Sequence, residues 1–160
     1  MIAPITPSLW FDGLAQAAAE FYCSVFPNSR ITSIAHYPPG SPGEVGSVMT
    51  VAWELDGQPF LGINGGPQFS FDEAISFLIT CADQAEVDRY WDQLLAGGGE
   101  EQMCGWLKDR FGLCWQVVPA GLDEVLNDSD PDRARRATAA MLQMRRLDLA
   151  ALRAAADAEA

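Results

Sequence analysis

The sequence predicts an α+β protein built from two copies of a strand–helix–strand–strand–strand (βαβββ) module. In each copy an apolar strand leads to an aspartate, Asp12 or Asp83, placed to begin a helix. Each of these helices contains an aromatic pair, Phe21-Tyr22 or Tyr90-Trp91, and each module closes with a turn and a further apolar stretch. Because these features recur in the same order, a repeated module explains them better than the weak self-similarity of any α+β chain.

The first module contains four predicted strands and one helix. The strand over 5–11 has Pro4 and Pro7 at its start, where an edge tolerates them, and the turn pair Asp12-Gly13 follows it. Apolar residues then recur at helical spacing until Pro27-Asn28, which predicts a helix over 14–26 with Asp12 as its cap. The remaining strands are predicted over 31–37, 47–55 and 60–64, and the turn Asp56-Gly57 joins the last two as a hairpin.

The second module repeats this order, and a helical tail follows it. A strand is predicted over 74–82, a helix over 84–95, short strands over 100–103 and 105–108, and a last strand over 113–118. We place the paired modules at 1–119, divided into about 1–67 and 68–119, and the tail at 120–160. Pro131 follows a capping aspartate and begins a helix that reaches Arg146, and a last, Ala-rich helix follows. The tail is too short to be expected to form its own core, so it should pack on the body or on a partner, or stay partly free.

Composition excludes several classes of partner. At 160 residues with 49% apolar content, the chain is long and apolar enough for one packed domain. Its net charge of −12 argues against nucleic acid or an anionic membrane as a partner, and no apolar run approaches transmembrane length. The four cysteines show no CxxC spacing, and residues 1–4 show no signal-peptide pattern. We therefore expect a cytoplasmic protein with reduced thiols.

Several stretches resemble a known family. They are ITPSLWFDG at 5–13, ELDGQPF at 54–60, NGGP at 64–67 and CGWLKD at 104–109. In these stretches the chain resembles the PhnB-like family, often labelled "3-demethylubiquinone-9 3-methyltransferase", of the vicinal-oxygen-chelate superfamily. Glyoxalase I, bleomycin-resistance proteins and extradiol dioxygenases belong to the same superfamily. The resemblance implies that the two modules form a cupped mixed sheet, with C-terminal helices added, and that the protein is commonly a homodimer.

The resemblance also implies where a metal would bind. Superfamily members that use a metal ligate it with His and Glu from the first and last strand of each module. The matching positions here are Thr6 or Ser8, Gly62 or Asn64, Ile75 or Phe77, and Gln116, and none of them is a carboxylate or an imidazole. The only histidine, His36, lies outside this pattern, and Cys114, which strand alternation places on the same face as Gln116, is the one soft donor nearby. We expect no catalytic metal and no other cofactor.

A methyltransferase site is not evident in the sequence. Methyl transfer from S-adenosylmethionine usually uses a glycine-rich turn after a parallel strand. Gly97-Gly98-Gly99 follows a helix, and Asn64-Gly65-Gly66-Pro67 leads into a linker, so neither is typical of such a turn. We therefore treat the family label as a name and not as evidence of the activity.

Five residues are candidates for ligand binding. Trp106 and Trp115 are placed to stack a flat ligand, Gln116 and Asn64 offer amides, and Cys104 is a thiol close to Lys108 in sequence. The alternative is that both tryptophans are core residues and that Lys108-Asp109 is only a turn. A cysteine nucleophile would need a base, and His36 is the only imidazole.

Three functions remain open on sequence alone. The first is a metal-free small-molecule binding protein with an aromatic-lined cup, and we favour it. The second is an enzyme of the superfamily, lyase-like or a methyltransferase as the label suggests. The third is a dimeric structural or regulatory protein with a vestigial cavity. We expect a homodimer because the tail carries apolar side chains that the body does not fully absorb. The sequence does not identify the ligand.

Overall fold

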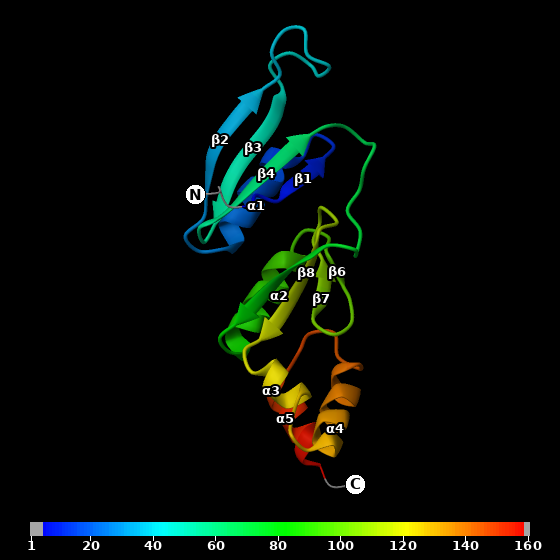
Figure 1. Cartoon of the computed structure of the whole chain (residues 1–160). Coiled ribbons are helices and arrows are strands. Elements are labelled where there is room, and N and C mark those ends of the chain that lie inside the picture. The colour runs from blue at the N-terminus through cyan, green and yellow to red at the C-terminus, as the bar shows by residue number, and fades with distance from the viewer. Residues whose placement is uncertain (1–4, 159–160) are drawn as a thin grey trace. The chain divides into compact units, whose positions relative to one another are not determined.

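The computed structural model describes residues 5–158, which fall into two compact units, divided between Phe71 and Asp72 (Figure 1). Each unit contains one four-stranded sheet, and the second also contains three C-terminal helices. The predicted α+β class, the repeated module and the C-terminal helices are therefore confirmed. The expectations about Pro4 and the N-terminal signal pattern fall on residues 1–4, outside the described part.

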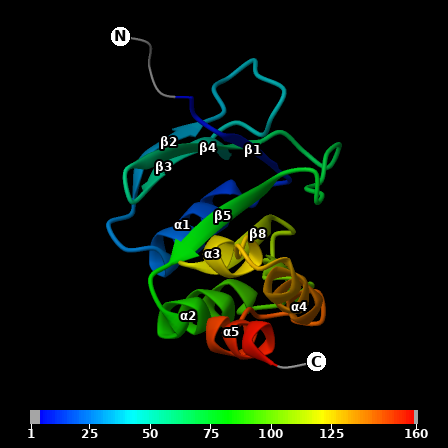
Figure 2. The ribbon, with the colours of Figure 1, turned by 60° about the horizontal axis from the view of Figure 1, so that its bottom comes forward.

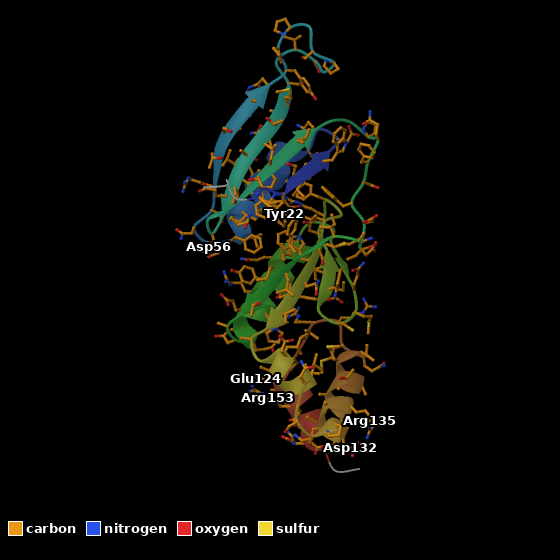
Figure 3. All side chains as sticks on the ribbon, viewed as in Figure 1. Tyr22, Asp56, Glu124, Asp132, Arg135 and Arg153 are labelled. Carbon is orange, nitrogen blue, oxygen red and sulfur yellow. The ribbon has the colours of Figure 1, made fainter. Side chains whose placement is uncertain are left out.

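Unit 1 is one complete βαβββ module. It consists of β1 (Ser8–Phe11), α1 (Ala15–Val25), β2 (Arg30–His36), β3 (Val48–Leu55) and β4 (Gln58–Asn64). The strand order is β1-β4-β3-β2, with β1 parallel to β4 and the other pairs antiparallel. Asp56 and Gly57 have positive φ angles of 45° and 85°, which confirms the tight hairpin between β3 and β4 (Figure 3).

One face of the unit 1 sheet packs against α1 (Figure 2). Aromatic rings fill the layer between them. The Trp53 ring lies between Tyr22 of α1 and Phe60 of β4, with ring centroids 6.2 and 5.7 Å away. A Cβ at Gly62 would lie 3.0 Å from the Cβ of Ala15 and 3.0 Å from the Trp53 ring, so this glycine allows helix and sheet to approach. Among the described residues of unit 1, no helix covers the opposite face of the sheet.

The start of α1 corrects one prediction. Asp12 does not cap the helix, whose N-cap residue is Leu14 without a capping side chain. Instead, Asn64 at the end of β4 accepts a hydrogen bond from the Ala15 amide through Oδ1, at 2.9 Å. An amide of the first helical turn, which has no acceptor within the helix, thus donates to a side chain of the strand β4. The role assigned to Asp12 was wrong because the side chain that accepts from Ala15 lies 49 residues beyond Ala15 in the chain.

Unit 2 repeats the module with shorter middle strands. It contains β5 (Ser76–Cys81), α2 (Gln84–Leu95), β6 (Glu100–Glu101), β7 (Trp106–Lys108) and β8 (Cys114–Pro119), in the order β5-β8-β7-β6. Here the predicted cap is confirmed, because Asp83 accepts a hydrogen bond from the Glu86 amide at 2.9 Å. The helix bounds match the prediction as well. The two sheets share one strand order, which supports the repeat.

The tail forms α3 (Leu122–Leu126), α4 (Pro131–Met141) and α5 (Leu149–Asp157), which lie together in Figure 1. The expectation that it lacks a core of its own was wrong. Side chains from all three helices and the segment before α5 bury one another: Leu122, Val125, Ala137, Leu147, Leu152 and Ala156. The third helix, α3, was not recognised in the sequence, and it supplies two members of this cluster. The segment 142–146, expected to be helical, lies beyond α4.

The tail is attached to its own unit. The amides of Cys104 and Gly105 donate to the carbonyl oxygens of Met144 and Arg145, each at 2.7 Å. Gln84 Nε2 donates to the Leu147 carbonyl oxygen at 3.0 Å. A Cβ at Gly105, where φ is +82°, would lie 2.8 Å from the Leu147 side chain. The tail therefore lies against the strand β7 and the start of α2.

Candidate functional site

The unit 2 sheet has one packed face and one open face. Leu107, Trp115 and Val117 are buried on the face toward α2. Side chains alternate along a strand, so their neighbours in sequence point to the opposite, open face. Trp106 lies directly across from Gln116, and Gln116 lies across from Leu78. An aromatic, an amide and an aliphatic side chain thus form one row over β7, β8 and β5.

A hollow of about 260 Å³ lies beside this row. Leu78 and Gln116 line it together with Thr80 and Val118 of the open face and with the segment 119–123 at the start of the tail. The Gln116 amide nitrogen donates to Ser76 Oγ at 2.8 Å, which fixes the side chain and leaves its carbonyl oxygen available as an acceptor. The row therefore offers stacking surface, apolar surface and one oriented acceptor.

Trp115 lies on the other face of the sheet. It is 3% exposed, contacts the Phe77 ring with centroids 5.6 Å apart, and donates from Nε1 to Asp109 Oδ2 at 2.9 Å. Asp109 is itself buried and also accepts from the amides of Phe111 and Leu113, at 2.8 and 3.1 Å. This carboxylate fixes the turn before β8 and the indole. Trp115 is thus a packed residue that a ligand on the open face does not reach.

Of the two cysteines of interest, Cys104 faces the tail and Cys114 is buried. Cys104 has a φ of +61° and its Sγ lies 3.7 Å from the Met141 carbonyl oxygen, so the thiol faces the tail. Lys108, proposed as its neighbour, forms a 2.6 Å ion pair with Glu73. Cys114 shares the open-face parity of Gln116, as predicted, but it is fully buried, and burial raises the pKa of its thiol. It therefore holds its proton more strongly than an exposed cysteine.

Asn64, the fifth candidate, points into unit 1 toward α1. Besides capping that helix, its Nδ2 donates to the Val48 carbonyl oxygen at 3.0 Å. Gly62 and Phe77 also face the packed layers, at Ala15 and at Trp115 respectively. The open-face positions of β4 are therefore Leu61 and Ile63, and those of β5 are Ser76 and Leu78.

The donors on the open faces do not fit a catalytic metal. Ser8, Ser76 and Gln116 offer neutral oxygens, whereas transition metals in proteins are held by imidazole, thiolate or carboxylate. His36 is exposed on β2. Across residues 5–158, no group of three or more His, Cys, Asp or Glu side chains is arranged to hold an ion.

Sequence reasoning missed a second hollow, which lies in unit 1. Its lining includes Asp12, Gln16, Tyr37 and Gln68, none of which was considered for binding. The available signal was the pair Gly65-Gly66 directly after β4, since glycine marks a close approach of another group to the backbone.

Comparison with known proteins gives one family. The family model described as 3-demethylubiquinone-9 3-methyltransferase matches residues 3–118. Among solved structures, a putative 3-demethylubiquinone-9 3-methyltransferase, the PhnB protein of Bacillus cereus, is 34% identical with a TM-score of 0.67. The match covers 74% of this chain and 100% of that one. No curated protein matches the chain.

More distant structures share the fold. A Pseudomonas aeruginosa protein is 20% identical with a TM-score of 0.60, over 74% of this chain and 98% of its own. The fosfomycin resistance protein FosX of Listeria monocytogenes, solved with manganese(II) and sulfate, is 14% identical with a TM-score of 0.53. That match covers 79% of this chain and 98% of FosX.

Nothing in the described helices suggests a membrane span. Among residues 5–158, none of the helices has both the length and the apolar character needed to cross a bilayer.

Proposed function

The chain belongs to the PhnB-like family of the vicinal-oxygen-chelate superfamily, and we propose that it is a metal-free small-molecule binding protein. The model of this family is described as 3-demethylubiquinone-9 3-methyltransferase. The observation that carries the proposal is the row Trp106–Gln116–Leu78 on the open face of unit 2, next to a hollow. An indole and an aliphatic side chain on either side of an oriented acceptor suit a flat ligand with one hydrogen-bond donor.

Within this proposal Trp106 stacks on the ligand and Gln116 accepts its donor. The other three candidates support the site without touching the ligand. Cys104 contacts the tail, Asn64 stabilises the fold of the first module, and Trp115 stabilises the fold of the second. The row contains only neutral groups, so binding relies on apolar contact and hydrogen bonding and does not require an ion. We place the protein in the cytoplasm, where its unpaired thiols stay reduced.

We predict that a compound from a screen of aromatic metabolites, quinones and antibiotics raises the thermal midpoint in buffer that contains EDTA. A ligand that binds only the folded state stabilises it by mass action, by about 2.7 kcal/mol at a hundredfold excess over Kd. Trp106→Leu should abolish the shift, whereas Phe69→Leu, which also replaces an aromatic side chain by leucine but at an exposed position of unit 1, should leave it intact.

Two outcomes would contradict this proposal. One is a screen in which no compound raises the midpoint of the folded protein. The other is a shift that appears only when zinc, nickel, manganese or iron is added back and that disappears in Gln116→Ala. The second result would identify a metal site and would favour an enzyme of the superfamily.

We also propose a homodimer, for a reason that differs from the one given by the sequence. Leu147 and Leu152 of the tail are fully buried within their own unit, so they do not provide the interface. Exposed apolar side chains remain on or beside the sheets outside that row, at Ile34 and Ile75, with exposed fractions of 38% and 67%. Sheet faces with such side chains favour self-association.

Light scattering after size exclusion should therefore give twice the 17.4 kDa chain mass at micromolar concentration. Ile34→Lys should shift the protein toward the monomer, because a charge at an apolar interface is costly to bury. A wild-type mass of 17.4 kDa under these conditions would refute the dimer.

A further inference from the structure

Unit 1 contains a cavity of about 550 Å³, and the residues that line it all belong to unit 1. It lies between the end of β4, the turn before α1 and the loop that joins β2 to β3. That volume falls within the range of about 300–1,000 Å³ that is typical of pockets for small organic ligands. The polar side chains that line it include Asp12, Gln16, Tyr37, Asn64 and Gln68.

Hydrogen bonds around Tyr37 hold one wall in place. Its hydroxyl donates to the carbonyl oxygen of Asn64, the residue that caps α1. Its amide donates to the Ser47 carbonyl oxygen at 2.9 Å, and its carbonyl oxygen accepts from the Gly46 amide at 3.0 Å. The loop between β2 and β3 is thus tied at its base, and the wall is preorganised for a ligand.

Two glycines let aromatic rings lie directly against the backbone of the cavity. A Cβ at Gly43 would lie 2.5 Å from the Tyr37 ring, and a Cβ at Gly65 would lie 2.0 Å from the Trp10 ring. Trp10 also donates from Nε1 to the Gly66 carbonyl oxygen at 2.8 Å. The cavity wall therefore depends on glycine at these positions, because a side chain at either one would displace the ring that packs against it.

The charge of the lining selects the ligand class. Asp12 is the only ionisable carboxylate in the lining, and no Lys, Arg or His lines the cavity. Within residues 5–158, no hydrogen bond or ion pair engages the Asp12 carboxylate. Gln68 is exposed at the rim, and the Gln16 amide nitrogen donates to Glu20, which leaves the Gln16 carbonyl oxygen as an acceptor. The lining is thus rich in acceptors and carries a negative charge.

We propose that this cavity binds a small hydroxylated organic cation, with its ammonium group on the Asp12 carboxylate. The hydroxyl groups of the ligand bond to the amides of Gln16 and Gln68. An ammonium beside a carboxylate makes a charge-assisted hydrogen bond, which is stronger than a neutral one. Anions are disfavoured both by Asp12 and by the net charge of −12.

The test is an NMR titration of the full chain with three matched sugars: cationic glucosamine, neutral N-acetylglucosamine and anionic glucose 6-phosphate. Glucosamine should shift the backbone amide signals of Gly13, Gly65 and Gly66 at millimolar concentration, and the other two sugars should shift them less. Asp12→Asn should raise the Kd for glucosamine about tenfold, since one charge-assisted contact is lost.

Asp56→Asn is the matched control, because it makes the same chemical change in the same unit, at the hairpin turn (Figure 3). It should bind glucosamine as the wild type does. The proposal is overturned if the three sugars shift these glycine signals equally, if none of them does, or if the two variants lose the same affinity. Since the signals belong to unit 1, the outcome does not depend on Trp106.

Discussion

Asp109→Ala should lower the free energy of unfolding by about 3–5 kcal/mol, the largest loss we expect from a single polar residue. The carboxylate accepts from the amides of Phe111 and Leu113 and from the Trp115 indole, at 2.8 to 3.1 Å. Removing it leaves these donors without an acceptor in a buried region, and each unsatisfied buried group costs about 1–3 kcal/mol. Urea unfolding followed by far-UV circular dichroism measures the change.

A double-mutant cycle separates the indole from the turn. The two amides share Oδ1, and the indole donates to Oδ2, so Asp109→Asn can keep the turn while it places an NH₂ group against the indole donor. We expect Asp109→Asn to cost more in the wild type than in Trp115→Phe, where that donor is absent. Equal costs in both backgrounds, or an Asp109→Ala variant within about 0.5 kcal/mol of the wild type, would show that this network is not stabilising.

The hydrogen-bond network of Asp109 explains why Trp106 is better placed for ligand binding than Trp115. Trp106 and Trp115 look alike in sequence, each close to a polar residue on a short strand. Strand alternation predicts that Trp115 and Gln116 point to opposite faces, and the structure confirms that rule. What the sequence does not reveal is which face is open. That depends on where α2 packs, and Trp115 lies on the packed side with its indole held by Asp109.

Elements governed by local interactions could be predicted. The helix α2 begins at a cap three residues from its partner amide, and its bounds match the prediction. On β3, Val51 and Trp53 are buried at period two, as expected from the alternation with Thr50 and Glu54. In both cases the determining contacts lie within a few residues of one another, so the sequence pattern carries the information.

Elements governed by distant contacts could not be predicted. The sheet face toward which Gly62 and Phe77 point depends on the register with neighbouring strands. Both residues were assigned to the open faces from the sequence, whereas they point to the packed faces. In the tail, the five-residue helix α3 is too short for a periodic signal, and without it the tail has too few apolar positions for a core. Its side chains become a core only when α4 and α5 fold back on them.

Asn64→Ala should lower the free energy of unfolding by about 2–3 kcal/mol and should do so without any ligand present. Its Oδ1 accepts from the Ala15 amide at the start of α1, and its Nδ2 donates to the Val48 carbonyl oxygen. Loss of the cap accounts for about 1 kcal/mol, and the groups left unpaired account for the rest. The residue was a candidate for ligand binding, whereas this prediction treats it as a structural link between α1, β3 and β4.

Two further variants show whether the cap is the cause. Asn64→Asp keeps the acceptor and adds a negative charge near a helix N-terminus, which is favourable, but its carboxylate cannot donate to Val48. We expect it to be less damaging than Asn64→Ala. Asp12→Asn should change stability by less than about 0.5 kcal/mol, because Asp12 makes no capping bond. If Asp12→Asn proved as destabilising as Asn64→Ala, the helix would depend on the local aspartate after all, and the unpaired carboxylate on which the cation site rests would not exist.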